Sequence, residues 1–156
     1  MSARPAIPLP VDSLAYAFHG AAGIVADVLG GRSLADGAVA RVEAPARPAV
    51  QDLVYSTLRQ YGWGEFMLAR LLTRPLSVPE IHALLLVALQ RLAARPETAH
   101  TVVDQAVSAA GLVARGALRG LVNGVLRNYL RQQAEQQAAA AADEVATLRH
   151  PHWWLE

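Results

Sequence analysis

The 156-residue chain contains no cysteine, no lysine and no long apolar run. Without cysteine it has no disulfide, no thiolate metal ligand and no cysteine nucleophile. Its longest apolar run, Ala83 to Leu89, is far shorter than the ~20 residues that span a bilayer. The opening Met1 to Pro10 holds three prolines and no secretory core, so the cytoplasm is the expected location. All 14 basic residues are arginine and 31 residues are alanine, a bias typical of GC-rich bacterial genomes rather than of a function.

The remaining composition favours a folded helical protein. Hydrophobic residues make up 53% of the chain and the formal net charge is only +1, which excludes a disordered chain. Aromatic residues reach only 6%, while alanine, leucine, arginine and glutamine, which favour helices, are abundant. At this length one core is feasible and a second full domain is not. The composition predicts an all-α fold, a compact bundle of about seven helices.

Turn and capping signals divide the chain into helices. A tail over residues 1–11 precedes a first helix that starts at Asp12 or Ser13 and ends at Gly30. Gly62 and Gly64 are expected to break the second helix from the third. The Ser77 to Glu80 segment has the pattern of a capping box for a central, almost wholly apolar helix. The expected helices are, in chain order, 12–29, a second opened by Pro45 and Pro48 and running to 61, 65–73, 81–92, a fifth from Glu97 or Thr98 to 110, 112–131 and its Ala/Gln-rich continuation 132–148.

The chain carries no pattern that supports catalysis. The five histidines lack a glycine-framed serine or a metal-spaced partner, and His150-Pro-His152 has no second cluster to complete a metal site. Neither a phosphate-binding GxxxxGK[ST] loop nor a GxGxxG loop is present. We therefore expect no catalytic residue, no bound cofactor and no metal in this chain, and no enzymatic activity of its own.

The strongest charge signal lies between Gln105 and Ala134, thirty residues with four arginines and no acid. An acid-free arginine face with glycines nearby lets a phosphate backbone approach closely, so the signal favours RNA binding. A solvated helix face in an arginine-only protein is the alternative. On one continuous helix, two of these arginines face solvent and the first two lie nearer the core border. The candidate RNA-binding residues are Arg115, Arg119, Arg127 and Arg131.

Asn123 and Gly124 interrupt the same segment with two residues that disfavour helices. We expect Asn123 to be a structural bridge to a neighbouring segment, with RNA contact as the lesser alternative. Gly124 is expected to mark a close contact between two helices.

Three stretches resemble a known family. Leu118-Arg-Gly-Leu-Val-Asn-Gly-Val-Leu-Arg127 is similar to the asparagine-helix signature of NusB-like domains. Arg95 to His100, followed by the Val103-Asp-Gln-Ala106 pattern, and Asp52 to Arg59 resemble two further segments of that family, although the arginine that usually follows the aspartate is absent. Over residues 12–154 the chain resembles a NusB-like domain.

Two groups share this domain: NusB-type antitermination factors and the RsmB (Sun) ribosomal RNA (cytosine-5)-methyltransferases. NusB-type chains tend to have an acid where Arg127 stands, and the segment Arg149 to Trp154 resembles the HPxW motif that precedes the RsmB catalytic domain. The resemblance therefore implies a NusB-like domain over 12–148 and, over 149–156, the start of a linker to a missing methyltransferase domain. Whether Leu155 and Glu156 are native stays open.

The resemblance implies an RNA-binding accessory domain that positions 16S ribosomal RNA for a methyltransferase. S-adenosylmethionine and the attacking cysteine would then belong to the missing domain, and the partners would be ribosomal RNA and the chain's own C-terminal methyltransferase domain. A NusB-type factor that binds a ribosomal protein, or another protein-interaction bundle, is the alternative. The family often places basic clusters at its first helix, whereas Val11 to Leu29 holds no arginine. Any RNA contact would then fall on the four candidate arginines.

Overall fold

The computed structural model describes residues 9–31, 39–133 and 135. Within these ranges the chain forms helices and no strand, which confirms the all-α prediction. The α-helices of the described ranges number six, close to the seven expected, and four short 3-10 turns separate some of them. The elements are α1 (Leu14–Leu29), η2 (Val39–Arg41), η3 (Ala44–Ala46), α2 (Arg47–Arg59), α3 (Tyr61–Leu71), α4 (Pro79–Ala94), η4 (Pro96–Thr98), α5 (Ala99–Ala110), η5 (Ala114–Gly116) and α6 (Arg119–Arg131). Most of the expected tail and of the 132–148 continuation, and all of the 149–156 linker, lie outside the described residues.

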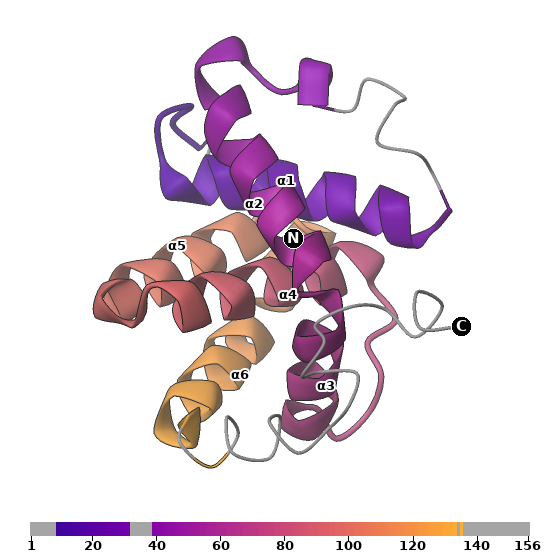
Figure 1. Cartoon of the computed structure of the whole chain (residues 1–156), viewed down its shortest axis with the longest axis vertical. Helices are drawn as coiled ribbons and strands as arrows, with labels where there is room; N and C mark the ends of the chain where they lie inside the picture. Colours follow the sequence, from indigo (N-terminus) through magenta and orange to yellow (C-terminus); the bar gives the residue numbers. More distant parts are fainter. Residues whose placement is uncertain (1–8, 32–38, 134, 136–156) are drawn as a thin grey trace, which may run out of the picture.

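Helix α4 is the centre of the bundle, as its apolar sequence predicts. All five other α-helices contact it, with α1 and α2 on one side and α3 and α6 on the other (Figure 1). From Ala83 to Leu89 every residue of α4 is buried. A helix that is apolar all round is stable only when other elements pack against each of its faces. The five other α-helices pack against α4 in this way.

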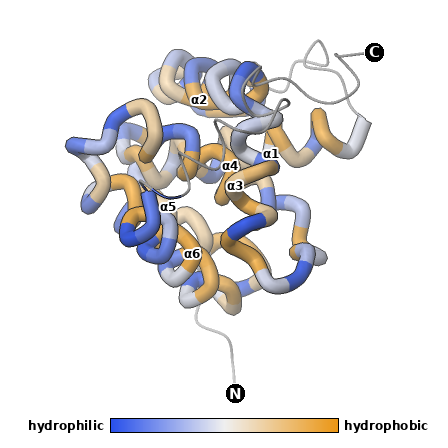
Figure 2. Tube along the Cα trace, turned by 60° about the horizontal axis from the view of Figure 1, so that its bottom comes forward, coloured by the Kyte–Doolittle hydropathy of each residue, from blue (hydrophilic) through white to orange (hydrophobic). Residues whose placement is uncertain are grey.

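The outer helices are amphipathic and begin where the sequence indicates. In α1 the hydroxyl oxygen of Ser13 accepts a hydrogen bond from the Tyr16 amide at 3.1 Å, which satisfies one of the unpaired donors of the first turn. The same helix is tied to α5 because the Ala15 amide donates to the Gln105 side-chain oxygen at 3.1 Å. Hydrophilic and hydrophobic residues alternate along α2 and α5 (Figure 2), as expected of helices with one buried face.

The two glycines expected to end the second helix lie inside α3 instead. Helix α2 ends at Arg59 and α3 already begins at Tyr61, so Gly62 and Gly64 are buried residues of its first turn. A Cβ on Gly64 would lie 3.1 Å from the Leu86 Cδ2 atom of α4. The absence of a side chain at Gly64 therefore lets α3 approach the central helix closely, which is a packing role rather than a helix-breaking one.

The predicted capping box at the start of the central helix is wrong. Helix α4 begins at Pro79, its N-cap is Val78, and no side chain caps it. Proline needs no amide partner at the first helical position, so the helix begins too late for Ser77 to act as the cap. None of the described helices is long and apolar enough to cross a membrane.

Replacing Leu86 by alanine should test the packing of the central helix. Leu86 is 1% exposed and touches α3 at Gly64, so the cavity left behind should lower the free energy of unfolding by about 2–5 kcal/mol. Denaturant unfolding measures the change. Leu29→Ala, at a position that is 39% exposed, is the control and should change stability by no more than about 0.5 kcal/mol. Equal effects of the two variants would contradict the central role of α4.

A pH-dependent loss of stability should trace to His19. Burial in α1 lowers the pKa of His19 below its ordinary value of 6.5. The unfolded chain then binds the proton more readily than the folded chain, so the free energy of unfolding should fall as the pH drops below about 6.5. Urea unfolding at several pH values measures this slope, and His19→Gln should flatten it. Identical slopes for the variant and the parent chain would contradict the assignment.

Candidate nucleic-acid interface

The segment expected to form one helix from 112 to 131 is divided by a left-handed turn. Ala114, Arg115 and Gly116 all have positive φ, at 49°, 57° and 75°. Such backbone is unfavourable for the first two residues because each carries a Cβ atom. Arg115 therefore does not belong to the same helix as Arg119, and its expected position on that helix is wrong. Backbone strain of this kind is often found at functional sites.

The turn brings the first two candidate arginines together at the start of α6. The Arg119 Nε atom donates a hydrogen bond to the Gly116 carbonyl oxygen at 3.3 Å. A Cβ on Gly116 would lie 3.1 Å from that same Nε, so only glycine combines this φ with this neighbour. Arg119 thus reaches back over the turn that carries Arg115. Both side chains are exposed rather than at the core border as expected.

The N-terminus of α6 adds positive potential at the same place. No side chain caps this end, and its first turn contains no acidic residue. The unpaired amides and aligned peptide dipoles of a helix N-terminus attract anions. Together with Arg115 and Arg119, this end of α6 favours a phosphate group.

The remaining two arginines lie on the outer face of α6. Its inner face is held by Val122, Val125, Leu126 and Tyr129, all buried. The Tyr129 ring meets Trp63 of α3 edge to face, with centroids 6.3 Å apart. At about 100° per residue, Arg127 and Arg131 point away from this inner face and are exposed. We call the set Arg115, Arg119, Arg127 and Arg131 the arginine face.

Asn123 supports one of these arginines and, among the described residues, does not form the bridge to a neighbouring segment that we expected. Its Oδ1 atom accepts a hydrogen bond from Arg127 Nε at 2.9 Å, one turn along the same helix. This contact holds the stem of Arg127, and because it uses Nε, it does not occupy the two terminal nitrogens of the guanidinium. Those terminal nitrogens are the donors that pair with phosphate oxygens.

Within the described part of the chain Gly124 does not mark a close contact between two helices, contrary to our expectation. It is exposed, and no described atom lies within 4 Å of a Cβ built on Gly124 or on Gly120. Neither glycine has a positive φ. Each costs the helix about 1 kcal/mol relative to alanine, and internal packing explains neither of them. They leave the outer face of α6 flat beside Arg127 and Arg131.

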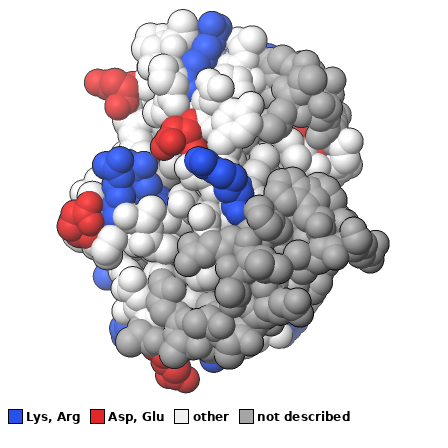
Figure 3. Space-filling view, in the orientation of Figure 1, with Lys and Arg blue, Asp and Glu red and all other residues white. Residues whose placement is uncertain are grey.

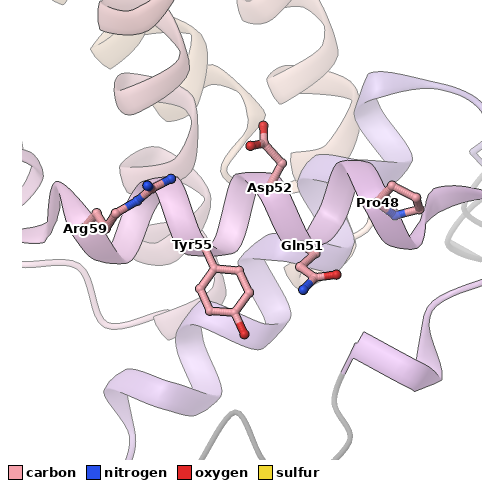
Figure 4. A pocket seen from close by; sticks show the side chains of 5 residues that line it. All are labelled: Pro48, Gln51, Asp52, Tyr55 and Arg59. Carbon is pink, nitrogen blue, oxygen red and sulfur yellow. The ribbon is translucent and has the colours of Figure 1, made fainter.

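Other surfaces of the described residues are weaker candidates. A hollow of about 560 Å³ on α2 is lined by one helix alone, by Pro48, Gln51, Asp52, Tyr55 and Arg59. Figure 4 shows these side chains fanning outward, with Asp52 pointing away from Tyr55, so they do not converge on a ligand. Basic and acidic side chains are interspersed on this side of the molecule (Figure 3). Within the described ranges no group of three metal-ligating side chains occurs, and the His150–His152 pair lies outside them.

The geometry defines a class of protein, an all-α bundle that presents an arginine-bearing helix to solvent. The family model described as NusB family matches residues 31–131, more than half of the chain. The chain belongs to the NusB family. A search of curated proteins found no match to it. Membership agrees with the resemblance seen in the asparagine helix and indicates a helical module that binds RNA or protein.

The prediction of one continuous helix missed the turn before α6 and the pairing of Asn123 with Arg127. The sequence contains signals for both. Gly111 and Gly116 stand five positions apart at the start of that segment, and such a pair indicates a turn rather than a continuous helix. The pairing of Asn123 with Arg127 follows from the i, i+4 spacing on a helix. The strained φ of Arg115 had no signal, because arginine gives no preference for left-handed backbone.

Replacing Gly124 by alanine should make the protein more stable. The new methyl group enters open space, and alanine favours the helix, so the free energy of unfolding should rise by about 1 kcal/mol. Thermal or denaturant unfolding measures the gain. Gly116→Ala is the matched control and should destabilise, because its φ of 75° is unfavourable for a residue with a Cβ and the Arg119 side chain would have to shift. A decrease in the stability of Gly124→Ala would show that a neighbour already occupies this face.

Proposed function

We propose that this chain is the RNA-binding accessory domain of an S-adenosylmethionine-dependent 16S ribosomal RNA (cytosine-5)-methyltransferase of the RsmB type. In this proposal the arginine face holds the phosphate backbone of ribosomal RNA. The domain works in the cytoplasm and has no catalytic residue of its own. It positions RNA for a methyltransferase domain that carries the cofactor and the cysteine nucleophile.

The absence of acids around the arginine face is the observation that carries the RNA-binding proposal. Four exposed arginines lie within the thirty residues from Gln105 to Ala134, and no carboxylate in that segment offsets them. Phosphate contacts by arginine supply most of the affinity of nucleic-acid binding. The uncapped start of α6 adds to the same attraction. Membership of a family associated with RNA binding supports the same conclusion.

The exposed glycines give the arginine face a second property. Because Gly120 and Gly124 lack side chains, a sugar-phosphate backbone can lie against the helix itself beside Arg127. A partner that needs close approach explains why the helix carries two residues that disfavour it. Gly124→Ala should therefore weaken RNA binding even though it stabilises the fold.

The methyltransferase part of the proposal depends on the resemblance of His150-Pro-His-Trp153 to the HPxW motif and on the arginine at position 127. The gene sequence beyond Trp154 tests it directly. A reading frame that continues into an S-adenosylmethionine-binding domain with a cysteine nucleophile would support the proposal. A stop codon shortly after Trp154 would favour a NusB-type factor instead.

Replacing Arg127 and Arg131 together by alanine tests the arginine face. If both contact phosphate, affinity for ribosomal RNA fragments should fall about equally across sequences. The salt dependence of log K should flatten by about 0.7 to 0.9 for each phosphate that the variant can no longer neutralise. Fluorescence anisotropy over a salt series measures both quantities. Folding should be unchanged because both side chains are exposed.

Arg59→Ala with Arg95→Ala is the matched control for that experiment. These arginines are also exposed but lie on α2 and after α4, so the control removes the same net charge elsewhere. It should leave the salt slope close to that of the parent chain. An equal decrease in affinity in both double variants would mean that RNA binding depends only on the net charge of the protein and that α6 is not a specific site.

A protein-interaction module is the second candidate, and exposure of Tyr55 on α2 is the observation that favours it. This side chain is 45% exposed beside Arg59, and tyrosine and arginine are enriched at the centres of protein interfaces. Binding that depends on Tyr55 and is insensitive to salt would support this candidate over RNA binding.

A further inference from the structure

A small cavity lies between α3, α4 and the segment that joins them. Its volume is about 350 Å³, within the range of small-ligand sites. Unlike the hollow on α2, it is lined by two helices and their connecting segment. The lining residues are Glu65, Leu68, Ala69, Leu72, Thr73, Arg74, Pro75 and His82.

The polar end of the cavity is a carboxylate held by a histidine. His82 Nε2 lies 2.5 Å from Glu65 Oε1, and the two side chains are 28% and 34% exposed. A carboxylate can accept about four hydrogen bonds, so the contact with His82 leaves acceptor sites free. The Glu65 carboxylate also affects a neighbouring tyrosine. The pKa of Tyr61 is raised to about 12, mainly by burial and to a smaller extent by the negative charge of Glu65. The carboxylate is thus fixed in position and only partly solvated.

The remaining lining suits a flat ring. Leu68, Leu72 and Pro75 supply apolar walls, and the exposed Arg74 stands at the rim. Unstacked bases of RNA stack on guanidinium planes or aromatic rings and are hydrogen-bonded at their edges, and pockets for flipped-out bases also use apolar side chains. An aliphatic ligand would leave the remaining acceptor sites of the carboxylate unfilled, which is costly in a partly buried site.

A second cavity connects this site with α6. It has a volume of about 310 Å³, shares Leu72, Thr73, Arg74 and Pro75 with the first, and reaches Leu121 and Val125. Around α6 the next positions beyond these two on the outward side are Asn128, then Gly124 and Arg131. The two adjoining cavities form a trough that runs from Glu65 across the connecting segment to the side of α6.

We propose that the cavity at Glu65 and His82 binds one unpaired guanine of the RNA whose phosphates lie on the arginine face. Guanine is the base that presents two adjacent donors, N1–H and the N2 amino group, and the Glu65 carboxylate supplies acceptors for both. This assignment rests on the proposed RNA-binding function. It adds that the bound RNA is single-stranded at this point, because a paired guanine has no free Watson–Crick edge.

A purely structural role is the competing explanation of the same contact. His82 and Glu65 join α3 to α4, so the pair would stabilise the bundle whether or not a base binds. The two roles differ in their effect on which nucleotide binds. A contact that only joins two helices would give the protein no preference for one base over another.

Titration of the folded chain with the four nucleoside 5′-monophosphates, followed by NMR chemical shifts, tests the guanine site. GMP should bind about ten-fold more tightly than AMP, CMP or UMP, as expected for a paired contact to a base edge. Glu65→Gln should remove that preference, while Glu97→Gln, an exposed acid on η4, should leave it intact. Equal binding of all four nucleotides by the parent chain would overturn the proposal.

Ala69→Phe gives an independent variant if Glu65→Gln fails to fold. Ala69 lines the cavity but is exposed, so a ring there fills the site without disturbing the core. The preference for GMP should disappear with the thermal midpoint unchanged. Retention of the preference in this variant would overturn the proposed location.

Binding to RNA oligonucleotides separates failure of this inference from failure of the proposed function. Replacing each guanine in turn by inosine, which lacks the N2 amino group, should reduce affinity several-fold at one position only. If none of these replacements changes the affinity for RNA, the proposed guanine site is wrong, while the proposed role of the arginine face is unaffected. Absence of RNA binding altogether would contradict the proposed function, and with it the inference, whatever GMP does.

Discussion

The burial of α4 on all sides is the constraint on which the rest of the structure depends. A helix with a continuous run of buried residues from Ala83 to Leu89 cannot stand at the surface, so each neighbouring helix must turn its apolar stripe toward it. This requirement places α3 and α6 side by side below the central helix (Figure 1), where Trp63 and Tyr129 meet. The trough and the arginine face both follow from that placement.

Helix α6 shows how a buried face permits an unusual exposed one. Val122 and Tyr129 are completely buried, and their packing holds the helix in place. Tertiary packing of this kind outweighs intrinsic propensity. The outer face can therefore carry Gly120 and Gly124, which would weaken an isolated helix. Three residues of the arginine face, Arg119, Arg127 and Arg131, thus lie on a rigid helix and not on a loop.

Much of the fold could be predicted from the sequence because it depends on local patterns. The apolar run of α4 and the Ser13 cap each follow from residue spacing, and both are found in the structure. The geometry of the turns was harder to predict from the sequence. The positive φ of Arg115 depends on how α5 and α6 pack, and the failed cap at Ser77 depends on where proline lets the helix begin.

The candidate site likewise has a part that the sequence predicts and a part that only the structure shows. The charge of the four arginines is visible in the sequence, since it needs only composition along one segment. The contact between Glu65 and His82 is not, because these residues lie 17 positions apart on different helices. Only the close packing of α3 on α4, permitted by Gly64, brings the carboxylate and the imidazole together.

The position of α1 has a practical consequence for any shortened version of the protein. The segment matched by the NusB family begins at residue 31, after α1 has ended. Yet α1 packs against α2, α4 and α5, and Phe18, Ala21 and Val25 have no exposed surface. A fragment cut at the family boundary would leave one side of the central helix in water and would aggregate. An expression boundary must therefore lie before Ser13, which caps α1.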